Sequence, residues 1–182
     1  MKSLLPSLFL ALAAAVFSGC VAHVETERKV FHLLSDKPAS GSFAVLPGDG
    51  AKGSSLEFTH HAARTSIYLK HLGYRMINPG EQPDFVLRLD YGMTPVTSRR
   101  IRRYLTINMM DTRLSAQNKP ALVYQGEVFS DGTSLNSAKI VPIMIDTLMR
   151  DFPGRIGNDE SFSYPTNFDE LVYQRNGPEN AR

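Results

Sequence analysis

The sequence has very little cysteine and no marked excess of either charge. Its 182 residues contain one cysteine, Cys20, and the formal net charge is +2 at pH 7. A single cysteine excludes a disulfide within the chain and leaves a free thiol, an intermolecular bridge or a covalent modification. A charge so close to balance gives no reason to expect nucleic acid as a partner.

Long apolar segments are scarce as well. The longest, residues 4–17, is interrupted by Pro6 and Ser7. It is shorter than the roughly 20 residues that a helix needs to cross a bilayer. The segment follows Lys2 and precedes two small residues, Ser18 and Gly19, which is the pattern of a secretory signal. We therefore expect residues 1–19 to be a signal peptide that is removed.

The residues Phe17-Ser18-Gly19-Cys20 resemble the lipobox of bacterial lipoproteins, with Phe17 where the pattern usually has Leu. The resemblance implies cleavage before Cys20, a thioether-linked diacylglycerol on its sulfur and an acyl chain on the new amino terminus. Two or three acyl chains anchor a protein stably. The alternatives are an ordinary secretory signal followed by a chance cysteine, or a short membrane anchor.

Val21 follows the cysteine, where many inner-membrane lipoproteins of Gram-negative bacteria carry Asp. The resemblance therefore favours an outer-membrane lipid anchor that faces the periplasm. We expect a lipidated N-terminus and tether at 20–41, in which 30–34 is a possible edge strand. An α+β periplasmic domain at 42–157 and a polar C-terminal tail at 158–182 then follow.

Hydrophobic periodicity predicts strands at 42–47, 74–77, 85–91, 101–111 and 121–129. A first helix begins at Ser54-Ser55-Leu56-Glu57, which has capping-box spacing, and ends at Gly73. A second helix is expected near 140–150, with Pro142 in its first turn. This order predicts an α+β two-layer sandwich, in which one mostly antiparallel sheet of about five strands carries two helices on one face.

Five motifs occur in order along the chain: Phe43-Ala44-Val45-Leu46-Pro47-Gly48-Asp49, Ser55-Leu56-Glu57-Phe58, Leu72-Gly73-Tyr74-Arg75, Pro83-Asp84-Phe85-Val86-Leu87 and Asp151-Phe152-Pro153-Gly154. Together they resemble the bacterial lipoproteins of domain of unknown function 4136, over about residues 22–157. The resemblance implies a signal peptide and a small α/β domain in the cell envelope. It implies no catalytic residues.

The sequence offers no pattern typical of an enzyme. It contains no Gly-x-Ser-x-Gly nucleophile elbow, and no phosphate-loop Lys follows the Gly48-Asp49-Gly50 turn. The spacing of His60, His61 and His71 does not place three metal ligands on one helix face, so surface histidines are expected. We expect no enzymatic activity, no catalytic or metal-binding residues and no cofactor beyond the lipid on Cys20.

The most distinctive local feature is the arginine cluster Arg99, Arg100, Arg102 and Arg103. On a strand, Arg100, Arg102 and Tyr104 share one face, while Arg99 and Arg103 point the other way. Such a surface suits lipid head-group phosphates, lipopolysaccharide or an acidic partner. The alternative is a charged hairpin that protects strand edges from aggregation.

The function expected from the sequence is non-catalytic binding of another envelope component. The partners are the membrane, through the lipid anchor, and an unidentified envelope protein or lipid. The alternatives are a carrier of a small hydrophobic or lipid ligand, which requires a deep apolar pocket, and an envelope hydrolase with an unconventional site.

Overall fold

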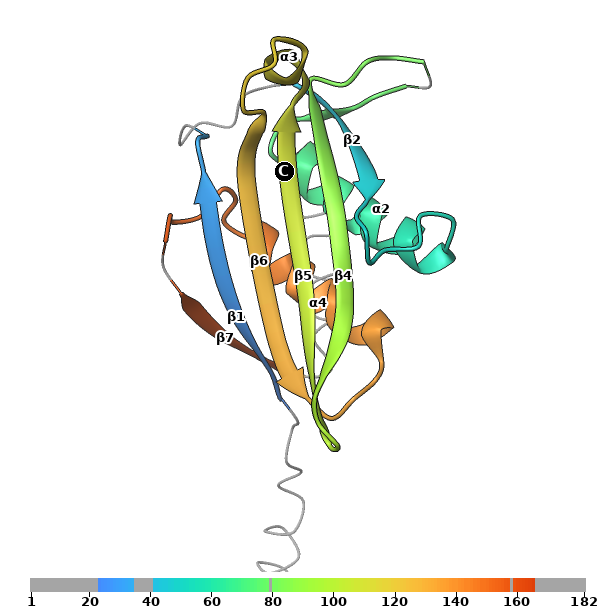
Figure 1. Cartoon of the computed structure of the whole chain (residues 1–182), viewed down its shortest axis with the longest axis vertical. Helices are drawn as coiled ribbons and strands as arrows, with labels where there is room; N and C mark the ends of the chain where they lie inside the picture. Colours follow the sequence, from blue (N-terminus) through green and yellow to red (C-terminus); the bar gives the residue numbers. More distant parts are fainter. Residues whose placement is uncertain (1–22, 35–40, 79, 158, 166–182) are drawn as a thin grey trace, which may run out of the picture.

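The computed structural model describes residues 23–34, 41–78, 80–157 and 159–165 (Figure 1). The elements follow in the order β1 His23–His32, β2 Ser42–Pro47, α2 Leu56–His71, β3 Arg75–Met76, β4 Phe85–Thr97, β5 Arg100–Asp111, α3 Thr112–Ala116, β6 Leu122–Gly132, α4 Ser137–Met149 and β7 Glu160–Pro165. The strands form one sheet in the order β3-β2-β4-β5-β6-β1-β7. Strand β2 pairs in parallel with β3 and β4, and the other pairs are antiparallel. The predicted α+β fold with one mostly antiparallel sheet is confirmed.

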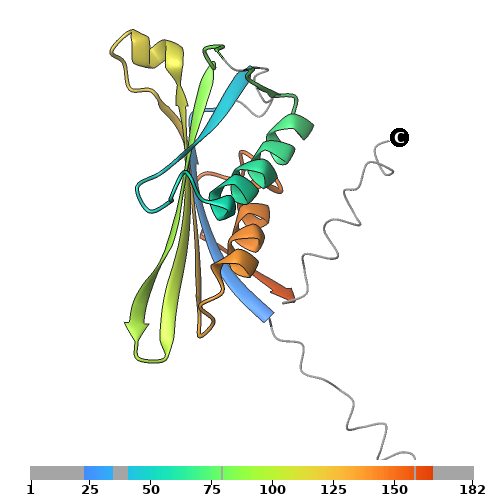
Figure 2. The ribbon, with the colours of Figure 1, turned by 90° about the vertical axis from the view of Figure 1, so that its right-hand side faces the viewer.

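Helices α2 and α4 lie on one face of the sheet, as predicted, and the short α3 follows β5 at one end (Figure 2). The core lies between these two helices and the sheet. Alternate side chains of the central strands are fully buried there, including Leu87, Leu89, Leu105 and Ile107. The opposite face carries no helix among the described residues, and we call it the open face. None of the described helices has the length and apolar character needed to span a membrane.

The prediction of about five strands was too low, because seven strands are described. Strand β1 lies within residues 20–41, which were expected to form a tether, and β7 lies within the expected tail at 158–182. Strand β1 is not an edge strand either, since it pairs with β6 on one side and with β7 on the other. Its inward positions include Thr26 and Arg28. Because these two residues are polar, the sequence of β1 lacks the apolar alternation that is typical of a buried strand.

The polar positions of β1 are satisfied inside the fold. Arg28 is 3% exposed and forms ion pairs with Asp151 and Glu160. It also donates to the carbonyl oxygen of Thr147 at 3.0 Å. A buried charge is tolerated when it is paired and hydrogen-bonded in this way. Arg28 therefore joins β1 to β7 and to the residues around the end of α4.

The helix boundaries differ in detail from the prediction. Ser55, rather than Ser54, caps α2, and its Oγ accepts the Phe58 amide at 3.0 Å. Helix α2 is followed by Gly73, as predicted, whose φ of +92° suits glycine. Helix α4 begins at Ser137, so Pro142 lies in its interior and not in its first turn.

Candidate functional site

The sequence-predicted arginines lie at one end of the open face. Asp131 of β6 lies directly opposite Arg102 of β5. Arg102 binds this carboxylate through Nε at 2.9 Å and Nη2 at 3.0 Å, and Arg100 adds a bond from Nη2 at 3.0 Å. These bonds, led by those from Arg102, lower the pKa of Asp131. Arg100 and Arg102 are thus brought together, yet their side chains remain 59% and 51% exposed.

Tyr104 shares the open face with Arg102 but lies against a neighbouring strand. It is paired with Gly92 of β4, where a Cβ atom would come within 2.6 Å of the Tyr104 hydroxyl oxygen. A Cβ atom on Gly50 would also come within 2.6 Å of that oxygen. The ring thus fits against two backbone positions where only glycine leaves room. Partial burial raises the pKa of Tyr104.

Arg103 points to the helix-covered face, as the strand alternation predicted, and is only 4% exposed. Its Nη2 donates to the carbonyl oxygen of Ser134 at 2.8 Å, and its Nη1 donates to the Ser130 hydroxyl at 3.3 Å. Burial lowers the pKa of Arg103, opposed by the charge of Asp131. Arg103 therefore holds the connection between β6 and α4 and is withdrawn from the exposed arginine surface.

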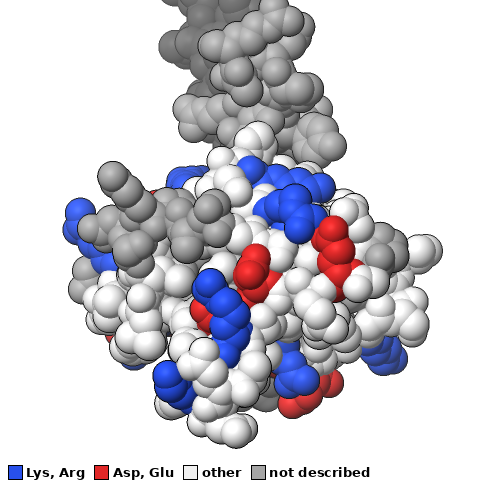
Figure 3. Space-filling view, turned by 90° about the horizontal axis from the view of Figure 1, so that it is seen from above, with Lys and Arg blue, Asp and Glu red and all other residues white. Residues whose placement is uncertain are grey.

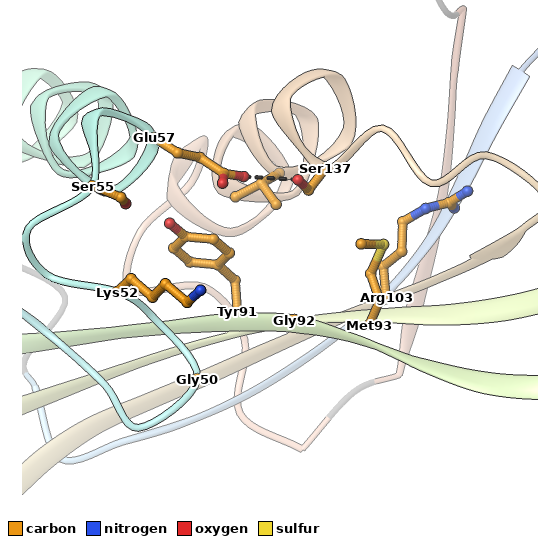
Figure 4. Close-up of a pocket in the computed structure, with 10 residues that line it drawn as sticks. Gly50, Lys52, Ser55, Glu57, Tyr91, Gly92, Met93, Arg103 and Ser137 are labelled. Atoms are coloured by element: carbon orange, nitrogen blue, oxygen red, sulfur yellow. Dashed lines mark hydrogen bonds between the residues drawn. The ribbon is translucent and has the colours of Figure 1, made fainter.

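A cavity of about 250 Å³ lies between the sheet and the first turns of α2 and α4 (Figure 4). It is lined by Gly50, Lys52, Ser55, Glu57, Tyr91, Gly92, Met93, Arg103, Ser137 and Val141. Glu57 accepts a hydrogen bond from the Ser137 hydroxyl at 2.7 Å, which links the starts of the two helices. Polar and charged side chains thus make up much of the wall.

His61 contacts Glu57 and Tyr91, two residues that line this cavity, and is 1% exposed, which corrects the expectation of a surface histidine. Its Nε2 is 3.6 Å from Glu57 Oε1, and its ring meets the Tyr91 ring edge-on at 5.0 Å. Neither ring nitrogen has a hydrogen-bond partner within the described residues. Burial lowers the pKa of His61, opposed by Glu57, so the ring is neutral at pH 7. Within the described part of the chain, His61 is therefore hydrogen-bonded to no hydroxyl group.

In the glycine-rich turn before α2, a backbone amide is hydrogen-bonded to a carboxylate of the protein itself. The amide of Gly50 donates to Asp90 Oδ1 at 2.6 Å. This bond fixes the turn against β4, which is a structural role. Across the described part of the chain, no group of three or more His, Cys, Asp or Glu residues is arranged to hold a metal ion. Cys20, the predicted lipidation site, lies outside the described residues.

No protein-family model and no curated protein matches the sequence. Among solved structures, the chain is similar to a PDZ domain protein from Parabacteroides distasonis, with 12% identity and a TM-score of 0.55 over 85% of this chain. The match covers 42% of that protein, so the chain spans about two fifths of its length. At this identity the likeness concerns the fold alone.

Two further structures are less similar. The PelC dodecamer from Paraburkholderia phytofirmans matches with a TM-score of 0.43 and 9% identity, over 71% of this chain and 99% of that chain. The hypothetical protein CT253 from Chlamydia trachomatis matches with a TM-score of 0.36 and 14% identity, over 62% of this chain and 93% of that chain. Neither likeness is high enough to bear on function.

Proposed function

We propose that the chain is a lipoprotein of the bacterial cell envelope whose α+β domain binds another envelope component without catalysing a reaction. Its lipid anchor is the acylated Cys20, in the outer membrane and facing the periplasm, as the residues Phe17-Ser18-Gly19-Cys20 and Val21 favour. The resemblance to the lipoproteins of domain of unknown function 4136 is part of the same proposal.

The observation that carries the binding function is the exposed pair Arg100 and Arg102. Both side chains are more than half exposed, and their guanidinium groups converge on one carboxylate, Asp131. Asp131 is the carboxylate bonded to both guanidinium groups, while the charge of Glu27 acts on Arg102 from further away. Planar guanidinium groups with free donors recognise phosphates and carboxylates. The surface therefore suits an anionic partner.

The two alternatives have less support from the geometry. A carrier needs a deep apolar pocket of roughly 300–1,000 Å³. The cavity near Glu57 is smaller, at about 250 Å³, and the charged side chains of Lys52, Glu57 and Arg103 line it. A second hollow, of about 490 Å³, is lined mainly by charged residues, among them Arg28 and Asp151.

In a serine–histidine hydrolase the base is bonded to its nucleophile, whereas His61 has no hydrogen-bonded hydroxyl group among the described residues. The Ser137 hydroxyl is bonded to the Glu57 carboxylate, a contact that links the first turns of α2 and α4.

Affinity isolation from detergent-solubilised envelopes tests the binding function. The full-length tagged chain is compared with Arg100→Ala/Arg102→Ala, and co-isolated proteins and phospholipids are both measured by mass spectrometry. Arg88→Ala is the matched control, because Arg88 is an exposed arginine of β4 that faces the same side. We expect the wild type and the control to recover a component that the double variant loses. Failure of the wild type to recover any specific component would contradict the proposal.

A further inference from the structure

Very little chain separates the proposed anchor from the folded domain. Strand β1 begins at His23, so only Val21 and Ala22 lie between Cys20 and the sheet. Consecutive Cα atoms are about 3.8 Å apart, and the three peptide steps from Cys20 to His23 therefore span at most ~11 Å. If Cys20 is acylated, as the proposed function requires, the start of β1 is held close to the membrane surface.

The same end of the sheet carries the arginine hairpin. Strand β1 runs antiparallel to β6, with Glu27 opposite Phe129, and β6 runs antiparallel to β5, with Phe129 opposite Tyr104. The start of β1, the end of β6 at Gly132 and the β4–β5 turn consequently lie at one end. Figure 1 shows all three at its lower edge. The anchor thus brings this end, rather than the α3 end, to the membrane.

The hairpin tip, residues 95–100, has the composition of a membrane-contacting loop. Arg99 is exposed at the turn, and Arg100, the first residue of β5, is 59% exposed. Val96, near the end of β4, is 51% exposed. The tip contains two arginines, Arg99 and Arg100, and no Asp or Glu. Leu135, on the nearby connection from β6 to α4, is 72% exposed. Arginine beside exposed apolar side chains suits the interface between head groups and acyl chains.

The nearby carboxylates do not cancel this charge. Asp131 is held by Arg100 and Arg102, and the charge of Glu27 also acts on Arg102. Arg99 forms no ion pair among the described residues, so its charge stays uncompensated. Glu25 of β1 accepts the Ser163 hydroxyl at 2.6 Å on the other side of β1 from β6. The tip therefore presents its positive charge outward.

The opposite end of the molecule has a different character. Viewed from that end, side chains of both signs are intermixed (Figure 3). Its arginines are paired locally, Arg75 with Glu81 at 2.7 Å and Arg113 with Asp111 at 2.9 Å. An intermixed surface gives little net attraction to an anionic membrane.

We propose that the hairpin tip, through Arg99 and Arg100, rests on the phosphates of anionic phospholipids in the membrane that holds the anchor. This proposal rests on the proposed function and names its partner as lipid. The acyl chains supply the attachment, while the tip fixes the orientation of the domain. Helix α3 then points away from the membrane.

The test measures how close each end of the acylated full-length chain lies to the lipid surface. In this protein the acylated Cys20 has no free thiol, so a cysteine introduced by Val96→Cys is the single site for a fluorescent label. Ser115→Cys, in exposed α3, is the matched label at the far end. Each protein is reconstituted into phosphatidylcholine vesicles with or without phosphatidylglycerol, containing a lipid with a spin-labelled head group.

In vesicles with phosphatidylglycerol, we expect several-fold stronger quenching at position 96 than at position 115. Each arginine near an anionic surface contributes about fivefold to contact. Arg99→Ala/Arg100→Ala should therefore reduce contact by more than tenfold, and Arg99→Lys/Arg100→Lys should retain it. Asp131→Asn removes the neutralising carboxylate and should increase contact.

Equal quenching at both positions, or none at position 96 while the protein floats with the vesicles, would overturn the lipid contact. The anchor and the proposed function would then stand, with Arg100 and Arg102 left to bind a protein. If the isolated chain carries no acyl group by mass and does not float with the vesicles, the anchor fails and the lipid contact fails with it.

Discussion

Asp146 of α4 binds Arg64 of α2 across the interface between the two helices, with Arg64 Nε 2.8 Å from Asp146 Oδ1. The same carboxylate accepts the Tyr68 hydroxyl at 2.7 Å. Asp146 is only 1% exposed, so its charge depends on these partners. One carboxylate thus fixes how the two long helices lie beside each other on the sheet.

Removal of Arg64 should destabilise the domain substantially. Arg64→Met removes the cation that is paired with the buried Asp146, while the bond from the Tyr68 hydroxyl to Asp146 is kept. We expect a loss of about 3 kcal/mol in the free energy of unfolding. Tyr68→Phe removes one hydrogen bond and should cost about 1 kcal/mol. Urea denaturation measures both. Lys70→Met, at an exposed position of α2, is the control and should change stability by less than about 0.5 kcal/mol.

His61 should make stability depend on pH. Burial lowers its pKa below the unfolded value of about 6.5, so the unfolded chain binds more protons in the interval between the two. Stability contributed by His61 is therefore complete above about pH 6.5 and falls as the pH decreases toward the folded pKa. His61→Gln should flatten this slope between pH 7 and pH 5, whereas the exposed His60→Gln should not. Equal slopes of the free energy of unfolding against pH in the wild type and in His61→Gln would contradict a lowered pKa of His61 in the folded chain.

Gly126 should tolerate no side chain. A Cβ atom there would lie 2.6 Å from Leu148 Cδ1 and 2.5 Å from the Tyr124 hydroxyl oxygen, in the closed core. Gly126→Ala should cost about 1–3 kcal/mol through overpacking. Leu148→Ala alone should cost roughly 2–5 kcal/mol because it leaves a cavity. The Gly126→Ala/Leu148→Ala variant should lose less free energy of unfolding than the sum of the two single losses. A loss equal to that sum in chemical denaturation would contradict this packing.

Cys20→Ser should abolish metabolic labelling with a radioactive fatty acid and leave unprocessed precursor, because no thiol remains for the thioether bond. Labelling is measured by autoradiography of the immunoprecipitated chain. Arg88→Ala, which keeps the cysteine, is the control and should label as the wild type does. Unchanged labelling of Cys20→Ser would rule out this residue as the lipid attachment site.

Strands with regular apolar alternation could be predicted from the sequence, because side-chain burial repeats every second residue in β4 and β5. Of β1, only the end was indicated, by the possible edge strand at 30–34, because Thr26 and Arg28 occupy buried positions earlier in the strand. Arg28 is acceptable there only because Asp151 and Glu160 arrive from more than 120 residues away. Long-range compensation of this kind leaves no local pattern in the sequence.

The candidate site was predictable to a similar extent. Strand alternation correctly placed Arg100 and Arg102 on one face, but the position of Asp131 depends on the register between β5 and β6. Tyr104 lies over Gly92 because of the pairing between β4 and β5, which again is a property of the register. The burial of His61 has a weak sequence signal, because His61 follows Phe58 by three residues and precedes Leu69 by eight, on the buried side of α2. The polarity of the imidazole hid that signal, and the packing of its ring on Tyr91 depends on the tertiary fold.

The position of β1 between two later strands also constrains how the chain reaches its folded state. Glu27 pairs with Phe129 and Val24 with Tyr164, so the first strand of the domain finds its neighbours only after nearly all the following residues have arrived. A chain synthesised from its amino terminus therefore carries β1 without a partner strand until β6 and then β7 have followed. The sheet is complete only when its first and last described strands meet.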